Sequence, residues 1–189
     1  MSEQECGSDS IQIWLVTGTP GAGKSTIANL LARSWPRAAC IEGDVLQGFI
    51  VAGGVPPGHE PRKEAVIQTK LAVVNQALLA KSYADAGFCA VLDFVVATRE
   101  RLDIIRRVIG PHPLYLLVLD PGPEEVLRRD AGRENKHVAA FFLDHIDQLR
   151  ANLSGVGLWW TDTESSPEQV VSGVRLNAAE ACLPPVLGS

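Results

Sequence analysis

The sequence lacks the features that mark a protein for a membrane, for export or for binding a nucleic acid. Its longest apolar segment, residues 65–86, is interrupted by lysines and side-chain amides, which a membrane span would tolerate poorly. Residues 1–10 hold three acidic side chains and no apolar stretch, so they cannot serve as a secretory signal. The formal net charge is −5, and the 17 Lys and Arg residues are not gathered into one basic run, which disfavours a nucleic acid as partner. We therefore expect a soluble protein of the cytoplasm.

Cysteine is scarce as well, which excludes a second group of functions. Cys6, Cys40, Cys89 and Cys182 lie far apart, form no Cys-x-x-Cys pair and have no histidine nearby at metal-ligand spacing. A cysteine-based zinc site is therefore not expected, and we interpret all four as free thiols in a reducing compartment. The length of 189 residues, with 46% hydrophobic and 21% charged residues, is typical of one globular domain.

What the sequence does contain is a regular alternation of short apolar runs with helical patterns. Strands are predicted at residues 11–17, 38–41, 88–92, 114–119 and 157–161. Helices are predicted at residues 24–32, 45–50, 64–85, 99–109, 124–129, 138–152 and 167–178, and a Gly/Pro-rich loop at residues 53–58. Because parallel strands need crossover connections, the pattern predicts a doubly wound α/β fold with helices on both faces of a parallel sheet.

These boundaries also predict how the chain is divided. We expect one domain over residues 11–178, a loose tail over residues 1–10 and a second loose tail over residues 179–189. The helix at residues 64–85 carries apolar residues nearly all round, so we expect it to pack between the sheet and another layer.

The most specific motif lies between the first predicted strand and the first predicted helix. Residues 18–25 match G-x-x-x-x-G-K-[ST] at every fixed position. The glycines let successive backbone N–H groups curl around one anion, and the helix N-terminus adds partial positive charge. A glycine turn that merely opens a helix is the alternative, but the strand and helix context favours a nucleoside triphosphate site. The residues predicted to contact the nucleotide are Gly18, Pro20, Gly21, Ala22, Gly23, Lys24, Ser25 and Thr26, of which Thr26 is more simply the next helical residue.

Within that motif and after three strands lie the groups predicted to carry the chemistry. Lys24 brings a charge to the β- and γ-phosphates, and Ser25 offers a hydroxyl to Mg²⁺. Asp93 closes an apolar strand and is our second candidate ligand for Mg²⁺. Asp44 follows the second strand and is our candidate for the base that deprotonates an acceptor hydroxyl, with a helix N-cap as the alternative. For Asp120, which precedes Pro-Gly-Pro, turn and cap chemistry is the favoured interpretation.

A charged stretch follows the fourth strand. Residues 128–136 hold four cations, which is usually the sign of a solvated face. In a phosphate-binding fold the same stretch can form a lid whose guanidinium groups neutralise the transferred phosphoryl group. Arg129 and Arg133 lie four residues apart, hence on one helical face, and we predict that they act in catalysis, with Arg129 also contacting the nucleotide.

Together these residues resemble the small P-loop kinases of the nucleoside-kinase and gluconate-kinase type. The resemblance rests on residues 18–25, Asp44, Asp93 and residues 128–133, and it spans about residues 11–178. Within that group the sequence is most similar to the chloramphenicol phosphotransferase-like antibiotic kinases, which include a capuramycin-type phosphotransferase; zeta-toxin-like kinases are more distant. The fold that this implies is a P-loop NTPase three-layer α/β/α sandwich, with a five-stranded parallel sheet of order 2-3-1-4-5.

The resemblance also implies an activity. It is transfer of the γ-phosphate of ATP or GTP to a hydroxyl of a small molecule, such as an antibiotic or a related sugar or nucleoside, as in self-resistance. Asp44 matches the position of that family's catalytic base, and residues 155–163 look like its last strand, whose following loop lies near the nucleotide base. Two other functions stay open: a nucleotide-dependent switch that binds a protein partner, and a zeta-like toxin kinase acting on a sugar nucleotide. The sequence favours neither ATP nor GTP and indicates no oligomeric state.

The acceptor region departs from the family pattern. Residues 47–63 match no member residue for residue, so the resemblance implies no particular acceptor. Within this segment His59, Glu60, Arg62 and Lys63 could bind an acidic acceptor, and a solvated loop is the equally simple alternative.

Overall fold

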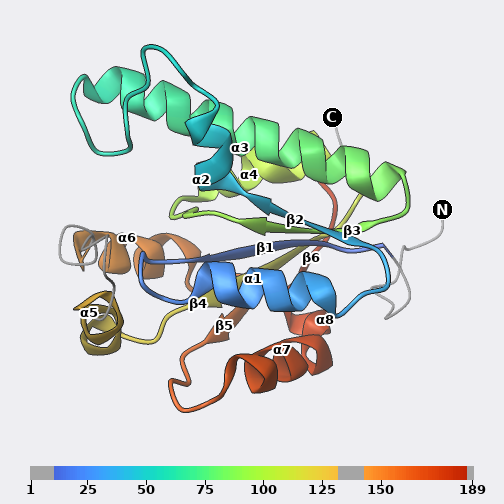
Figure 1. The fold of residues 1–189 in the computed structure, drawn as a ribbon. Helices are drawn as coiled ribbons and strands as arrows, with labels where there is room; N and C mark the ends of the chain where they lie inside the picture. Colours follow the sequence, from blue (N-terminus) through green and yellow to red (C-terminus); the bar gives the residue numbers. More distant parts are fainter. Residues whose placement is uncertain (1–10, 132–142, 187–189) are drawn as a thin grey trace.

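The computed structural model describes residues 11–131 and 143–186 of the chain, which form a sheet with helices on both faces (Figure 1). The strands are β1 (Ile13–Gly18), β2 (Ala38–Glu42), β3 (Cys89–Asp93), β4 (Leu114–Leu119), β5 (Leu158–Trp160) and β6 (Cys182–Leu183). The helices are α1 (Lys24–Arg33), α2 (Gly43–Gly48), α3 (Arg62–Asp85), α4 (Arg99–Ile109), α5 (Pro123–Ala131), α6 (Leu143–Leu153), α7 (Pro167–Leu176) and α8 (Ala178–Ala181).

The order of the strands confirms the predicted class and the order that the resemblance implied. Five parallel strands run β2-β3-β1-β4-β5, so that β1 lies at the centre between β3 and β4. In this register Val16 of β1 is level with Asp93 of β3, and Glu42 of β2 is level with the same aspartate. Because parallel strands end at one edge of the sheet, the segments after β1, β2 and β3 meet there.

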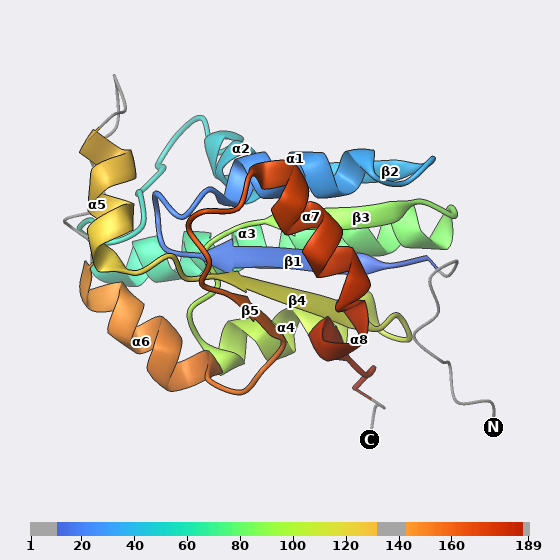
Figure 2. The same ribbon diagram turned by 90° about the horizontal axis from the view of Figure 1, so that it is seen from below.

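Two helical layers cover the two faces of the sheet. In Figures 1 and 2, α3 and α4 lie on one face, and α1 and α7 lie on the other. The central strand alternates between the two cores: Ile13 and Leu15 pack with the first layer, and Trp14 and Val16 pack with the second, all fully buried. Trp14 also stacks on Tyr115 of β4, with 5.0 Å between ring centroids. Burial on both faces explains why β1 is a continuous apolar run in the sequence.

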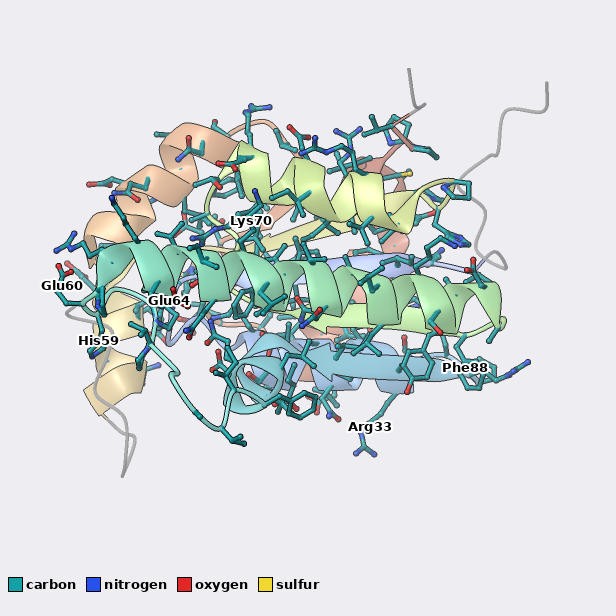
Figure 3. The ribbon with its side chains drawn as sticks, turned by 90° about the horizontal axis from the view of Figure 1, so that it is seen from above. Arg33, His59, Glu60, Glu64, Lys70 and Phe88 are labelled. Carbon is teal, nitrogen blue, oxygen red and sulfur yellow. The ribbon has the colours of Figure 1, made fainter. Side chains whose placement is uncertain are left out.

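The long helix α3 is covered on one side only. Its inner face buries alanines against the sheet and α4, whereas Ile67, Leu71 and Leu78 are 60%, 47% and 52% exposed on the outside. Figure 3 shows α3 as the element nearest the viewer. The expectation of a further layer over this helix is therefore wrong for the part of the chain that the structure describes. The prediction failed because it took every apolar residue of the helix as a buried position, whereas several of them are exposed. No helix in the described ranges is long and apolar enough to cross a membrane.

The end of the chain differs from the loose tail that we expected from residue 179 onward. Helix α8 ends at Ala181, and β6 then pairs antiparallel with the first half of β4, with Leu183 opposite Leu114 and Cys182 opposite Tyr115. Residues 179–183 are thus ordered against the sheet. A two-residue strand has no periodic pattern, so the sequence carried no sign of it.

The cysteines also differ in part from the prediction. Cys182 is disulfide-bonded, so the prediction of four free thiols is wrong for this residue. Cys40 and Cys89 are free, and Cys6 lies outside the described residues. Burial, followed by the charges of Asp93 and Glu42, raises the pKa of the Cys40 thiol to about 11, so this thiol is protonated at neutral pH.

Candidate active site

The loop after β1 has the backbone shape that binds phosphate. Gly21 and Gly23 have φ angles of 89° and 93°, which L residues with a side chain rarely adopt. The Ala22 N–H donates to the Thr19 carbonyl oxygen at 3.1 Å, which closes the turn. Gly23 is the N-cap of α1 and offers no side-chain cap, so the first turn of α1 presents its N–H groups at the mouth of the loop.

Two further contacts fix this loop against the rest of the fold. A Cβ atom at Gly18 would collide with the carbonyl oxygen of Leu119, the last residue of β4. A Cβ atom at Gly21 would lie 3.2 Å from the carbonyl oxygen of Val126 in α5. Close packing therefore requires glycine at Gly18, whereas at Gly21 the backbone conformation requires it and the packing is only tight. Helix α5 lies directly beside the loop.

Lys24 folds back over the loop that precedes it. Its Nζ donates to the Thr19 carbonyl oxygen at 3.1 Å, and the residue is half-buried. The ammonium group is therefore held against the loop, where it adds a full positive charge to the partial charges of the N–H groups. A polyphosphate fits this arrangement, because its negative charge is attracted by both the N–H groups and the ammonium group.

Asp93 is the buried member of the site. It ends β3, is 7% exposed, and accepts a hydrogen bond from the Ser25 hydroxyl. Desolvation raises the pKa of this carboxyl group, and the charge of Asp44 acts in the same direction; the Ser25 hydrogen bond and the charge of Lys24 act against it. The structure thus brings Lys24, Ser25 and Asp44 close enough to Asp93 to act on its carboxyl group, although the sequence separates them by up to 69 positions.

Asp44 lies in the first turn of α2 and is exposed. The N-cap of α2 is Glu42, so the alternative interpretation of Asp44 as the N-cap is wrong. The turn that presents Asp44 is tight, because a Cβ atom at Gly43 would collide with the ring of Phe94. Asp44 is therefore held at the edge of the sheet, next to Asp93 and open to solvent.

Sequence reasoning missed Gln76, which connects the strands under the two aspartates. Its side chain is fully buried in α3, and its Nε2 donates to the Ile41 carbonyl oxygen at 2.6 Å and to the Asp93 carbonyl oxygen at 3.1 Å. It thereby joins the ends of β2 and β3. A polar residue within an otherwise apolar helical stretch, level with the strand ends, was the available signal.

Asp120 does not have the turn and cap role that we favoured. Its buried carboxylate accepts two hydrogen bonds from the Arg150 guanidinium, at 2.8 Å from Nε and 3.0 Å from Nη2. Helix α5 begins only at Pro123, so Asp120 is too far from it to be its N-cap. The pair instead fastens α6 to the end of β4. Arg150 was missed because nothing local to it in the sequence indicates a partner 30 positions away.

The arginine stretch is described only in part. Arg128 of α5 donates two hydrogen bonds of 2.6 Å to the Glu125 carboxylate, so it is engaged on the same helix. Arg129 lies in α5 one turn after Val126, which adjoins the phosphate loop, but its side chain is outside the described residues. Arg133 also lies outside them. Figure 2 shows α5 and α6 together at the end of the sheet where β1 leads into α1.

On the acceptor side the charged residues are exposed and largely satisfied. Glu60 accepts from the Arg62 backbone N–H at 2.8 Å and from its Nε at 3.1 Å. The Nδ1 atom of His59 lies 3.2 Å from the Pro57 carbonyl oxygen, and Lys63 is exposed. Figure 3 shows His59 and Glu60 at the N-terminal end of α3. These contacts favour the solvated loop over a preformed site for an acidic acceptor.

A metal ion would find few protein ligands here. In the described ranges no group of three or more His, Cys, Asp or Glu side chains could hold a metal. The oxygen atoms of Ser25 and Asp93 are nevertheless the hard donors that Mg²⁺ prefers. Mg²⁺ that is bound by one or two protein groups, with phosphate oxygens and water completing its shell, fits this donor set.

The fold has many structural relatives among solved proteins. A sugar kinase from Janibacter sp. HTCC2649 is 23% identical, with a TM-score of 0.67, over 90% of this chain and 97% of that one. The tunicamycin resistance protein of Deinococcus radiodurans is 15% identical, with a TM-score of 0.66, over 93% and 99%. The Mycobacterium tuberculosis APS kinase CysC, solved with AMPPNP and APS, is 16% identical, with a TM-score of 0.62, over 90% and 98%. At these identities the likeness establishes a shared P-loop kinase-like fold. No curated protein sequence matches the chain.

A protein-family model gives the remaining comparison. The model for the AAA domain named AAA_33 matches residues 13–155, about three quarters of the chain. The match contains the phosphate loop, Asp44, Asp93 and the Asp120–Arg150 pair. The chain therefore belongs to the AAA_33 family of AAA domains, with a P-loop kinase-like α/β fold.

Proposed function

We propose that the protein is an ATP- or GTP-dependent phosphotransferase that moves the γ-phosphate to a hydroxyl group of a small molecule, with an antibiotic or a related sugar or nucleoside as the acceptor. The observation that carries this proposal is the meeting of Lys24, Ser25, Asp93 and Asp44 at the edge of the sheet. One lysine and one hydroxyl suit a nucleotide with its metal. A second carboxylate beside them is what a kinase needs in addition, because the acceptor must lose a proton.

Nucleotide binding is assigned to the loop and to the start of α1. The backbone N–H groups of residues 18–25 and the Lys24 ammonium would hold the phosphates, which lowers the free energy of the developing negative charge. Ser25 and Asp93 would hold Mg²⁺ together with phosphate oxygens, and when bound this ion neutralises charge on the phosphates. The raised pKa of Asp93 fits such a role, since a buried carboxylate without a cation is disfavoured in its ionised form.

Asp44 is assigned the role of base because of its contrast with Asp93. Asp93 is buried and bonded to Ser25, so it is occupied on the nucleotide side. Asp44 is exposed on the next strand–helix turn, where an acceptor from solution can reach it. Its carboxylate would accept the hydrogen bond of the acceptor hydroxyl, orient the oxygen toward the γ-phosphate and take its proton during transfer. Arg129 and Arg133 are proposed to neutralise the transferred group.

The test compares Asp44→Asn with Glu42→Gln, a matched loss of one carboxylate charge at an exposed position two residues away. Both variants and the parent protein are given γ-labelled ATP and GTP with sugar, nucleoside and antibiotic acceptors, and products are identified by a mass gain of one phosphoryl group. We expect Asp44→Asn to bind Mg·ATP normally and to lose at least about 100-fold in transfer rate, the usual contribution of a general base. Glu42→Gln should retain transfer.

Two results would contradict the proposal. Full turnover in Asp44→Asn removes Asp44 as the base. Slow hydrolysis of nucleotide by the parent protein, with no labelled acceptor in any class, removes the phosphotransferase and favours a nucleotide-dependent switch.

A further inference from the structure

A cavity of about 290 Å³ lies beside the proposed acceptor end of the site. It is lined by Gln47 of α2, by Ile50 just after that helix, by residues 54–57 of the Gly/Pro-rich segment, and by Gln68 of α3. The segment that the sequence indicated only as a loop is therefore one wall of a binding-sized space, of the order found for small-molecule sites.

Gln68 builds that wall and holds it in place. Its Oε1 accepts from the Val55 backbone N–H at 2.7 Å, and its Nε2 donates to the Gly53 carbonyl oxygen at 2.8 Å and to Glu64 Oε1 at 2.7 Å. The side chain is 8% exposed. Both N–H groups of the amide are thus engaged with the protein, so the loop is fixed to α3 and Gln68 has no N–H group left to donate to a ligand.

The cavity is aligned with Asp44 along α2. Asp44 and Gln47 lie three residues apart in α2, so they are neighbours on one side of the helix, and Ile50 follows two residues after the helix ends at Gly48. The Ile50 N–H donates to the Gln47 carbonyl oxygen at 3.2 Å, so the end of the helix tightens and these two side chains align more closely. With a rise of about 1.5 Å per residue in α2 and about 2 Å in the tightened turn after it, Gln47 lies about 5 Å and Ile50 about 10 Å along the axis from Asp44.

The lining carries no charge. Apart from the amides of Gln47 and Gln68, the lining side chains are aliphatic or prolyl. Two carboxylates that flank the lining in the sequence are already hydrogen-bonded, Glu60 to Arg62 and Glu64 to the Gln68 amide. Figure 3 shows Glu60 at the end of α3 and Glu64 farther along the same helix. A charged ligand group in this cavity would lose water without gaining a counter-charge, which is costly.

We infer that the acceptor of the proposed phosphotransferase presents an uncharged apolar group to this cavity while its hydroxyl lies at Asp44. The substrate class is a neutral alcohol that carries an aromatic or branched aliphatic group roughly 5–10 Å from the reacting oxygen. A cavity of about 150 Å³ already holds a benzene ring, so the space here accepts a substituted ring. Sugar acids and sulfated nucleotides do not fit this description. The inference rests on the proposed function for the role of Asp44.

The experiment uses the ¹⁵N-labelled full chain and two probes, 3-phenyl-1-propanol and gluconate. We expect the phenyl alcohol to shift the amide resonances of Gly54 and Val55 saturably, and gluconate to leave them unchanged. Val55→Glu places a charge in the lining and should weaken binding of the alcohol at least about 10-fold, as expected when an apolar contact is replaced by a charge. Val51→Glu makes the same change at a 96% exposed residue outside the lining and should bind as the parent does.

Each outcome bears on the inference. Equal affinities of the two variants overturn it, and so does a shift at residues 54–55 caused by gluconate and not by the alcohol, or by neither probe. The comparison of probes on the parent protein decides the question even if Val55→Glu does not fold. A separate titration with Mg·ATP, followed at the amide resonances of Gly21 and Gly23, tests the proposed function. If these resonances do not shift, the protein is not the proposed phosphotransferase, but binding of an apolar group in the cavity is not contradicted.

Discussion

Replacing Arg150 by alanine removes the tie between α6 and the end of β4. The substitution breaks two charge-assisted hydrogen bonds, of 2.8 and 3.0 Å, and leaves the Asp120 carboxylate without its counter-charge. The two side chains differ in exposure, 45% for Arg150 and 8% for Asp120, so the bond is neither fully solvated nor fully buried.

The expected magnitude follows from that intermediate position. Breaking a fully buried pair costs about 3–5 kcal/mol, because one charge is left behind in a low dielectric. Breaking an exposed pair costs about 0–1 kcal/mol, because water screens the charges and replaces the bond. We expect the free energy of unfolding to fall by about 2 kcal/mol, since water can reach Asp120 through the space that the arginine vacates. For a chain of this length that corresponds to a Tm lower by about 4–8 °C.

The assay is equilibrium unfolding in urea of four proteins: the parent, Arg150→Ala, Asp120→Asn and the double variant. Arg107→Ala is the control, because Arg107 is exposed and, among the described residues, donates only to the Asp103 carbonyl oxygen; it should change the free energy of unfolding by less than about 0.5 kcal/mol. The cycle should return a coupling energy of at least about 1 kcal/mol. A coupling near zero, or a loss in Arg150→Ala no larger than in the control, would refute the reasoning.

Two further substitutions test the strand ends. Asp93→Asn should stabilise the nucleotide-free protein by about 1 kcal/mol at neutral pH while abolishing the Mg·ATP-induced rise in Tm. Folding raises the pKa of the Asp93 carboxyl group, so its ionised form destabilises the folded state at pH values above the ordinary pKa of 3.8. The stabilisation by Asp93→Asn should therefore vanish as the pH falls toward 3.8. A Tm below that of the parent at pH 8 would contradict this. Gln76→Leu should cost about 2 kcal/mol because it removes the two buried hydrogen bonds to the Ile41 and Asp93 carbonyl oxygens, and it should raise the Mg²⁺ concentration needed for nucleotide binding. An unchanged Mg²⁺ requirement would limit Gln76 to a structural role.

The parts of the site that the sequence could predict are those fixed by local chain geometry. A glycine loop between an apolar strand and a helix needs only its own residues to adopt its shape, so its position could be inferred directly from the motif. Asp93 could be placed because a carboxylate at the end of a buried parallel strand must face the ligand edge. The strand order followed from the resemblance, and the structure confirms it.

The parts that the sequence could not predict depend on pairing across the fold. Asp120 looked like a turn residue because Pro-Gly-Pro follows it, and only the approach of α6 supplies Arg150. Gln76 reaches two strands at once, which no spacing along α3 reveals. The cavity wall arises in the same way, because Gln68 is bonded to Gly53, 15 positions earlier in the chain. In each case one polar side chain satisfies groups whose positions are set by a different element.

The glycines of the phosphate loop show why a local motif can still carry long-range information. The backbone conformations of these glycines account for the ring of N–H groups. Conformation alone does not restrict which elements of the fold can pack against the loop. The central position of β1 in the sheet adds a packing constraint. It places Gly18 against Leu119 at the end of β4 and Gly21 against Val126 in α5. A methyl group at Gly21 would have to move α5 by a few tenths of an ångström, and Arg129 lies one turn farther along that helix. The residues that shape the phosphate site therefore also set the distance between it and the helix that begins the arginine stretch, so a substitution there alters both at once.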